Sequence, residues 1–581
     1  MKLSSLKYVV LCGLLSTFAG CIEEGYDLSD IDTTSRFTVN DLIIPLNLDE
    51  ITLKSVIDIE EDSKIQIYTD ANGAEYYAVK ESGTFNSDPI HIDVVTCAGP
   101  VIAPTTVQIA QLPDMGGVSA GAMTMSYKIT PTGSSFAYDI VNIDESIHSV
   151  SAIGTKPMDI VLSLSTPGTG LNVSSMTFEN LKIQLPKGLV ATVSAGEYDR
   201  TTGILSIDRL VSAGTVARVT ITVTGIDMTA NGSVLDYGKH SLYYRGQVEV
   251  TSGVLSVTTA GGTLPNTIDF TTSYDFADIY ATSFSGEIEY LLSGVDVNDV
   301  DLSDIPDFLA GEGTNISLAN PQIYLSMNNP VGNDGLTCRT GLTITSKRDS
   351  EEYGSYSIDN PYFQIPDDFG DGPYYFCLSP KSPESVLPGY PANQLYHVGF
   401  ASLSDVLSGN GLPTSLGIHL DNPCIPMQKV TDFGLGKDIS GVDGSYEFFA
   451  PLALKEGSMI VYTDTDDGWN DEDVDAITVE KMEITALASS DIPLGVKLTA
   501  KVLGKDGKPL NAELSSVELP GNAKDFPFTI VLGEGQTVTN IDGITFTAYV
   551  KADAQTTLSP QQNIVLKEIR AKVSGNYTKE L

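Results

Sequence analysis

The chain has 581 residues, with 33 lysines and arginines against 75 aspartates and glutamates, so its formal net charge at pH 7 is −42. A chain this acidic is not expected to bind nucleic acid or an anionic lipid surface through general electrostatics. Hydrophobic residues make up 41% of the chain, which is enough to build buried cores and excludes a disordered protein. The length allows about four domains.

Residues 1–20 predict a secretory signal peptide that is removed from the mature protein. Lys2 and Lys7 precede an apolar stretch at residues 8–18. This stretch is too short to cross a bilayer, which takes about 20 residues in a helix. A basic start, a short apolar centre and small residues before the cleavage point are typical of secretory signals.

The signal ends in Phe18-Ala19-Gly20-Cys21. This stretch resembles the bacterial lipobox, an aliphatic residue and two small residues before a cysteine, although Phe18 stands where leucine is usual. The resemblance implies that the Cys21 thiol is acylated, with palmitate or a similar chain, and that cleavage makes Cys21 the first residue. Two acyl chains supply on the order of 20 kcal/mol of membrane anchoring, at about 0.8 kcal/mol per buried methylene. The alternative is a plain secretory signal with an incidental cysteine.

Residues 21–45 predict an acidic tether, whose carboxylates begin at Glu23, Glu24 and Asp27. An acidic stretch in this place resembles the export signal of surface lipoproteins in Bacteroidota. The resemblance implies the outer leaflet of the outer membrane and exposure at the cell surface. The alternative is a solvated tether that faces the periplasm. A second apolar run of spanning length is missing from the sequence, so the lipid is the one membrane attachment that we expect.

The remaining sequence predicts a mainly β chain of tandem antiparallel β-sandwich (Ig-like) modules with few short helices. Apolar and polar residues alternate in many places, for example along 496–502, as in a strand with one buried face. The 53 glycines and 29 prolines supply frequent turns. The expected divisions are an N-terminal β module at 46–130, one or more β-sandwiches at 131–285, an internally repeated β region at 286–455 and a C-terminal β-sandwich at 456–581.

Two internal repeats support this modular interpretation. MTFENLKI at 176–183 resembles ITVEKMEI at 477–484, and residues 302–323 resemble residues 403–425. The longer repeat predicts a short helical turn, a glycine reversal and a strand that stops at Asn-Pro, because proline cannot donate to a ladder.

One expected strand carries an irregularity. In residues 475–487 the apolar phase changes between Val479 and Met482. Because side chains alternate with a period of two, a one-residue shift would send every later side chain to the wrong face, so we expect a β-bulge there.

Residues 366–393 are rich in proline and predict a long loop region, and long loops on a β scaffold often carry binding sites. The region contains Tyr374, Tyr375 and Phe376 in succession. Neighbours on a strand point to opposite faces, so one ring packs while the next faces solvent. An exposed tyrosine can stack on a sugar ring, which makes Tyr374 and Tyr375 ligand candidates. The alternative is an ordinary cross-strand aromatic pair.

Residues 464–475, DTDDGWNDEDVD, hold seven carboxylates in twelve residues. Asp464, Asp466, Glu472 and Asp475 stand at positions 1, 3, 9 and 12 of an EF-hand-like loop, and oxygen ligands at these intervals suit calcium. Position 5 is glycine rather than a ligand, and position 6 is tryptophan where the standard loop requires glycine. The alternative is a solvated acidic connection, with the tryptophan packed at a module junction.

Catalytic motifs are weakly supported. Residues 117–121 match G-x-S-x-G, but that motif works between a strand and a helix, and nothing nearby predicts a βαβ unit. We therefore interpret the match as small residues in a turn and assign no catalytic residue. The five histidines stand singly, and no two cysteines have C-x-x-C spacing. The cysteines after Cys21, whose pairing the sequence leaves open, are Cys97, Cys338, Cys377 and Cys424.

These features predict a surface-exposed outer-membrane lipoprotein with a non-catalytic binding or structural role, whose ligand is a glycan or an envelope protein. One alternative is a β-fold polysaccharide-processing hydrolase, whose carboxylate pair has no sequence signature. Another is a subunit or anchor of a surface filament. Two facing carboxylates would favour the hydrolase, an aromatic platform would favour the binder, and an unpaired edge strand would favour assembly by strand addition.

Overall fold

A computed structural model describes residues 34–45, 51–52, 64–70, 72–112, 119–166, 171–263, 265–303, 309, 313–348, 350–408, 413–469 and 474–580. The predicted signal peptide, Cys21 and the first part of the tether lie outside these residues. The expectation of a mainly β chain is confirmed, with 64% of residues in strands and 4% in helices. Among the described residues, no helix is long and apolar enough to cross a membrane.

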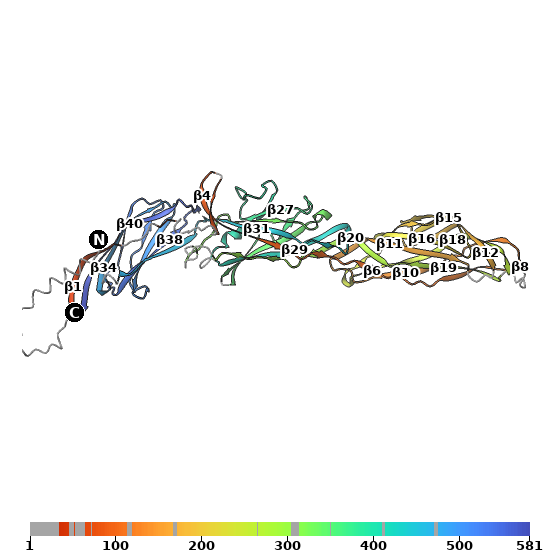
Figure 1. Ribbon diagram of the computed structural model, residues 1–581, viewed down its shortest axis with the longest axis horizontal. Helices are drawn as coiled ribbons and strands as arrows, with labels where there is room; N and C mark the ends of the chain where they lie inside the picture. Colours follow the sequence, from red (N-terminus) through yellow and green to blue (C-terminus); the bar gives the residue numbers. More distant parts are fainter. Residues whose placement is uncertain are drawn as a thin grey trace, which may run out of the picture. The chain divides into compact units, whose positions relative to one another are not determined.

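The chain divides into two compact units. Unit 1 comprises Met1–Ser55, Val461–Lys551 and Gln562–Leu581, and unit 2 comprises Val56–Ile460 and Ala552–Gln561. Unit 2 is therefore inserted into the sequence of unit 1. Figure 1 shows the consequence for unit 1, where strand β1 (Thr34–Pro45), in red, lies beside strand β40 (Asn563–Glu580), in blue.

Unit 1 is built from two antiparallel sheets. The first has the order β1-β40-β34-β37, with β2 also pairing β40, and the second has the order β33-β38-β35-β36. The alternation predicted along 496–502 is confirmed, since Val496, Leu498, Ala500 and Val502 are all buried. The further strands are β2 (Ile51–Thr52), β33 (Met459–Asp466), β34 (Ile477–Ser490), β35 (Gly495–Gly504), β36 (Val517–Leu519), β37 (Phe526–Val531) and β38 (Ile541–Lys551).

The predicted β-bulge lies in β34 and is confirmed. Val479 pairs with Gly575 and Lys481 with Ser574, so Glu480 is the extra residue on this strand. Its carboxylate accepts a hydrogen bond from Asn576 Nδ2 at 2.8 Å. On the other side of β40, β1 has its own register shift between Val39 and Leu42. Both bulges lie beside residues 573–575 of β40, so the strands on its two sides bend at the same place.

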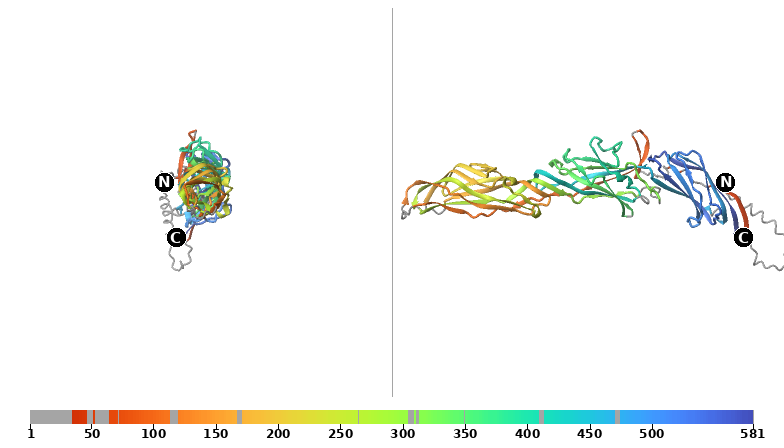
Figure 2. Two further views of the ribbon diagram at one scale, coloured as in Figure 1. Left: turned by 90° about the vertical axis from the view of Figure 1, so that its right-hand side faces the viewer. Right: turned by 180° about the vertical axis from the view of Figure 1, so that it is seen from behind.

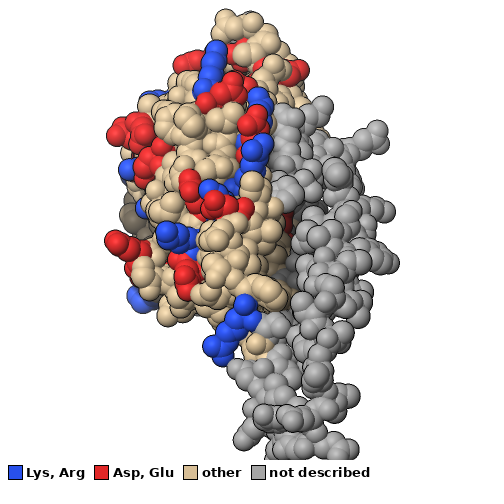
Figure 3. All heavy atoms as spheres, turned by 90° about the vertical axis from the view of Figure 1, so that its left-hand side faces the viewer, with Lys and Arg blue, Asp and Glu red and all other residues tan. Residues whose placement is uncertain are grey.

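Two ion pairs link charged side chains on unit 1 across neighbouring elements. Lys572 Nζ lies 3.1 Å from Asp41 Oδ1, and Lys567 Nζ lies 3.6 Å from Asp525 Oδ1. Figure 3 shows acidic and basic side chains interspersed over the described part of the face that it views. This face therefore presents no uniform field of one sign.

Unit 2 contains three large sheets. A 12-stranded sheet follows the order β13-β16-β11-β20-β29-β24-β25, with β6, β7, β19, β22 and β26 paired alongside. An 8-stranded sheet follows β10-β18-β12-β15-β14, with β8, β9 and β17 paired to β18. A 7-stranded sheet follows β21-β4-β31-β23-β27-β28, with β3 paired to β4. The right-hand view of Figure 2 shows the strands of unit 2 from behind.

The strands of the 12-stranded sheet come from three of the four expected modules, so its hydrogen bonds cross the expected divisions near 130 and 285. They are β6 (Val95–Cys97), β7 (Thr105–Gln111), β11 (Ile147–Ser165), β13 (Leu189–Val193), β16 (Val216–Asp227), β19 (Thr267–Phe276), β20 (Ile279–Leu291), β22 (Val300–Asp301), β24 (Cys338–Arg348), β25 (Glu351–Ser357), β26 (Phe363–Ile365) and β29 (Ser415–Gly434).

The 8-stranded sheet faces part of the 12-stranded sheet across an aromatic core, as in a β-sandwich. Phe178 of β12 lies 6.2 Å from Phe270 of β19, and Phe136 of β10 stacks on Phe276 at 5.5 Å. The strands of the 8-stranded sheet are β8 (Ser119–Ala120), β9 (Met123–Lys128), β10 (Thr132–Ile140), β12 (Leu171–Gln184), β14 (Glu197–Asp199), β15 (Ile204–Ala213), β17 (Leu235–Asp236) and β18 (Ser241–Thr263).

The repeated octapeptides occupy equivalent places in the two units. MTFENLKI lies in β12, between β18 and β15, and ITVEKMEI lies in β34, between β40 and β37. The pairing of β12 with β18 also shifts register in the repeat, between Glu179 and Lys182, opposite Gly253. Each repeat thus places a bulge against a Ser-Gly pair in the neighbouring strand.

The second copy of the longer repeat, residues 403–425, differs in part from the structure that we expected. The helical turn is present as the 3-10 helix η5 (Ala401–Asp405). The strand does not stop at Asn422-Pro423, because β29 continues through it to Gly434. Asn422 has φ +46°, and Pro423 O accepts a hydrogen bond from Leu292 N at 2.9 Å. The proline is tolerated because it sits in an irregularity, where its missing N–H interrupts no ladder.

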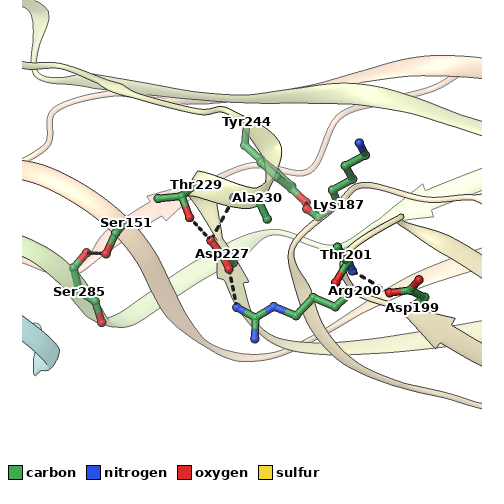
Figure 4. Close-up of polar contacts among 10 residues, drawn as sticks. All are labelled: Ser151, Lys187, Asp199, Arg200, Thr201, Asp227, Thr229, Ala230, Tyr244 and Ser285. Atoms are coloured by element: carbon green, nitrogen blue, oxygen red, sulfur yellow. Dashed lines mark hydrogen bonds and ion pairs between the residues drawn. The ribbon is translucent and has the colours of Figure 1, made fainter.

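The α-helix found among the described residues, α3 (Met228–Asn231), is held by a cluster of polar contacts (Figure 4). Asp227 accepts hydrogen bonds from Thr229 Oγ1 at 2.6 Å and Ala230 N at 3.1 Å, and pairs with Arg200 at 2.8 Å. The Thr229 hydroxyl, the Ala230 amide and Arg200 hold the pKa of Asp227 below its ordinary value. Its partners mark this carboxylate as a helix cap.

The bulge opposite Gly575 leads to a test of unit 1. A Cβ at this position would overlap the Thr478 carbonyl of β34, so Gly575→Ala should force the two strands apart and destabilise unit 1 by about 2 kcal/mol. Thermal unfolding and hydrogen exchange of β34 and β40 measure the effect. Gly504→Ala is the control within unit 1, because the nearest atom to its Cβ would be the flexible end of the Leu510 side chain, at 3.0 Å. Equal stability of the two variants would contradict the interpretation.

Candidate functional site

One face of the 7-stranded sheet gathers aromatic side chains from strands far apart in sequence. Its strands are β3 (Ile65–Thr69), β4 (Glu75–Asn86), β21 (Asp296–Val297), β23 (Gln322–Met327), β27 (Tyr374–Ser379), β28 (Leu395–Gly399) and β31 (Asp443–Pro451). Only β27 and β28 pair in parallel in this sheet. The register places Tyr68 opposite Tyr76, Lys80 opposite Phe449, and Tyr324 beside Glu447. We name this surface the tyrosine face, and its members are Tyr68, Tyr76, Tyr324, Tyr375, Tyr390 and Phe449.

The rings of the tyrosine face form two groups. In the first, the ring centroid of Tyr68 lies 6.1 Å from that of Tyr76 and 5.0 Å from that of Phe449, which it meets edge-on. In the second, Tyr390 lies 4.8 Å from Tyr324 and meets Tyr375 edge-on at 5.9 Å. Tyr324 and Phe449 are buried, whereas the other four rings are partly exposed. Such contacts contribute about 0.5–1.5 kcal/mol each beyond their buried area.

The proline-rich region, which we expected to be a long loop, contains strand β27 of this sheet, and its later part covers part of the face. Leu387 is buried against the sheet, and its backbone N–H donates to the Tyr324 hydroxyl at 3.2 Å. That hydroxyl in turn donates to Gln322 Oε1 at 2.6 Å. Tyr390 follows in the same loop and packs on Tyr324. The loop therefore adds a ring to the face rather than standing free in solvent.

A charge pair lies between the two groups of rings. Glu447 on β31 pairs with Lys80 on β4 at 3.4 Å, and its Oε2 atom is buried without a hydrogen bond. Burial raises the pKa of Tyr68 and Tyr390, and the nearby Glu447 carboxylate raises both further. Both phenols therefore stay protonated at neutral pH and can donate hydrogen bonds.

The structure separates the two tyrosines that the sequence singled out. Tyr374 is 1% exposed, accepts a hydrogen bond from Phe369 N and donates to Gly370 O, both at 2.9 Å. It holds the turn before β27 and offers no free ring in this structure. Tyr375 points to the other side of the strand, onto the tyrosine face. The expectation that one ring packs and its neighbour faces outward is confirmed here.

The acidic stretch is described only in part. Asp464 and Asp466 lie in β33, and Trp469 is buried and donates from Nε1 to Asp466 Oδ1 at 2.7 Å. Glu472 lies outside the described residues, and Asp475 is described only as backbone of the 3-10 helix η7 (Val474–Ala476). Across the described ranges, no three metal-ligating side chains are grouped to hold an ion. Calcium binding by the full set stays a prediction.

Ser119 of the G-x-S-x-G match and the four cysteines after Cys21 all lie in strands. Ser119 and Ala120 form β8, and the next element is strand β9 rather than a helix, so no strand-to-helix elbow follows Ser119. The four cysteines in the described part of the chain are free thiols. Cys338 and Cys377 lie in different sheets, on β24 and β27.

One histidine has charged partners that sequence reasoning missed. His91 Nδ1 lies 2.6 Å from Asp438 Oδ1, and Nε2 lies 3.1 Å from Asp93 Oδ1. These contacts secure the small pair of strands β5 (Ile90–His91) and β30 (Asp438–Ile439). Hydrogen bonds to Asp438 and then Asp93 raise the pKa of His91 above its ordinary value of 6.5. No local signal linked residues 347 positions apart.

Comparisons with known proteins leave the family open. A search with protein-family models finds no match, and a sequence search of curated proteins finds none either. A solved structure of a protein from Parabacteroides distasonis ATCC 8503, described as secreted, aligns with a TM-score of 0.34 and 13% identity. The alignment covers 51% of this chain and 90% of that one. A similarity of this size identifies neither a family nor a function.

Calcium binding at the acidic stretch predicts a metal-dependent stability of unit 1. About 10 mM calcium should add about 1.4 kcal/mol if the dissociation constant is about 1 mM. Thermal unfolding with and without calcium measures this, and Asp464→Asn should abolish the shift. Asp506→Asn, in the turn after β35 elsewhere in unit 1, is the control and should keep the shift. If calcium leaves the unfolding midpoint of the wild-type protein unchanged, the prediction of a calcium site is wrong.

The raised pKa of His91 predicts a stability contribution that depends on pH. The folded protein holds the imidazole proton more tightly than the unfolded chain does, so the contribution is complete below pH 6.5 and is lost as the pH rises through the raised pKa. Proton NMR of the His91 ring between about pH 5 and 8 reports this pKa. Asp438→Asn should lower it. If His91 has the same pKa in the wild-type protein and in the Asp438→Asn variant, Asp438 is not the cause of the raised pKa.

Proposed function

We propose that this chain is a surface-exposed, lipid-anchored protein of the outer membrane with a non-catalytic binding role, and that the tyrosine face is its ligand surface. The anchor is Cys21, and the ligand is a glycan or an envelope protein. The single observation that carries the binding role is the gathering of four partly exposed tyrosines on one face of a rigid sheet.

Chain connectivity supports the anchored arrangement. Twelve residues, 22–33, separate Cys21 from the first residue of β1, and fully extended they reach on the order of 40 Å. β1 pairs with β40 from Thr34 to Pro45. A lipid on Cys21 would therefore hold unit 1 near the membrane through a hydrogen-bonded strand, and unit 2 would be displayed as its insertion.

The contacts of the tyrosine face favour binding over hydrolysis. Glycoside hydrolases use two carboxylates about 5–10 Å apart on either side of the scissile bond. On the tyrosine face, the carboxylate described between the two groups of rings is that of Glu447, and it is paired with Lys80. An ion-paired carboxylate favours a positioning role over acid or base chemistry.

Assembly by strand addition is a second candidate role, because β1 stands at the edge of its sheet. Two of its apolar side chains, Phe37 and Ile43, are 52% and 56% exposed. An edge strand with exposed apolar side chains is a template for pairing with another chain. This observation supports a filament or adhesion subunit as the alternative.

The anchoring proposal is tested by Cys21→Ala, which should move the protein from the membrane fraction to the soluble fraction of lysed cells. Cys97→Ala is the control and should stay with the membrane. Protease treatment of intact cells then separates a surface location, where unit 2 is digested, from a periplasmic one. Membrane association that survives Cys21→Ala would overturn the lipid anchor.

A further inference from the structure

We infer that the tyrosine face binds a neutral polysaccharide chain, an inference that rests on the proposed binding function and names its ligand class. Several classes of ligand meet aromatic rings, so the argument turns on charge, hydrogen-bonding capacity and length. Each of these is set by described residues of the 7-stranded sheet.

Charge disfavours an anionic ligand. The chain carries a formal net charge of −42, which repels polyanions over the range of a Debye length. On the tyrosine face, the central charges of Lys80 and Glu447 neutralise each other at 3.4 Å. The face therefore offers no net positive site that would select a uronate, a sulfate or a phosphate.

The exposed groups combine apolar ring faces with hydrogen-bonding atoms. Tyr76, Tyr375 and Tyr390 are partly exposed, so each can present a ring to the C–H face of a sugar. Tyr68 and Tyr390 keep protonated hydroxyls, as their raised pKa values require. The Glu447 carboxylate is paired with Lys80 through its buried Oε2 atom, so we assign it no contact with the ligand. Rings together with neutral hydroxyl groups suit a hydroxyl-rich, uncharged ligand.

The extent of the face favours a chain over a single sugar. Tyr68 lies on β3 and Tyr375 on β27, and β4, β31 and β23 lie between these strands. At about 4.8 Å between neighbouring strands, the two ends of the face are roughly 19 Å apart. A monosaccharide would reach one group of rings, whereas an oligosaccharide segment would reach both.

Affinity electrophoresis of the full chain in detergent tests the inference, with polymers cast into native gels. The neutral probes are soluble starch, mixed-linkage β-glucan and yeast mannan, and the anionic probes are polygalacturonate and heparin. We expect at least one neutral polymer to retard the protein and neither polyanion to do so. Retardation by no neutral polymer, or by a polyanion as strongly as by a neutral one, overturns the inference.

Single-ring variants locate the site. Tyr76→Ala and Tyr375→Ala, one in each group of rings, should each weaken binding about three- to tenfold, the range expected for one aromatic contact. Tyr353→Ala is the matched control, because Tyr353 is 44% exposed but lies on β25 of the 12-stranded sheet. Unchanged melting curves show that the variants are folded. Equal binding by all three variants would place the site elsewhere.

Failure of this inference is distinguishable from failure of the proposed function. If intact cells expose the protein and Cys21→Ala releases it, while a protein partner rather than a glycan binds the tyrosine face, the anchored binding role stands and the ligand class is wrong. If Cys21→Ala stays in the membrane while the neutral polymer still binds, the ligand class stands and the anchor is wrong.

Discussion

The antiparallel ladder between β1 and β40 is the constraint on which the architecture of this chain depends. It joins residues more than 530 positions apart, as in the pairing of Thr34 with Glu580 and the hydrogen bond from Asp41 N to Ser574 Oγ. Because β40 pairs with β34 on its other side, the ladder completes the first sheet of unit 1 with a strand from the beginning of the chain. The chain must therefore leave unit 1 to form unit 2 and then return to unit 1. An anchor on a residue before residue 34 would be connected to unit 1 first.

The same local device occurs at two places in the fold. In β34 and in β12, one strand carries an extra residue opposite a glycine of a long partner strand, Gly575 in β40 and Gly253 in β18. The glycine is needed because a Cβ would meet the bulged strand at contact distance or closer. A bulge of this kind increases twist, which lets a long strand stay in its sheet while following the curvature of a sandwich.

The tyrosine face arises from strand alternation combined with an incompletely covered sheet. Side chains of β27 point alternately to the two sides, so Tyr374 and Phe376 enter the core while Tyr375 faces the rings and the loop. The loop covers Tyr324 through Leu387 and Tyr390 but leaves the neighbouring rings partly exposed. Because packing already holds these rings in place, they would lose little side-chain entropy if a ligand bound to this face.

The sequence by itself determined the local structure: the mainly β class, the alternation along 496–502, the bulge near Val479 and the opposite orientation of neighbouring tyrosines. These follow from a side-chain period of two, which is visible within a few residues. Only the tertiary structure decided that β1 pairs with β40, that one sheet crosses the expected modules, that Asn422-Pro423 lies inside a strand, and that Asp438 meets His91. Each depends on which strand edges meet across hundreds of residues, and the pairing of hydrogen-bonded edges leaves no periodic mark in the sequence.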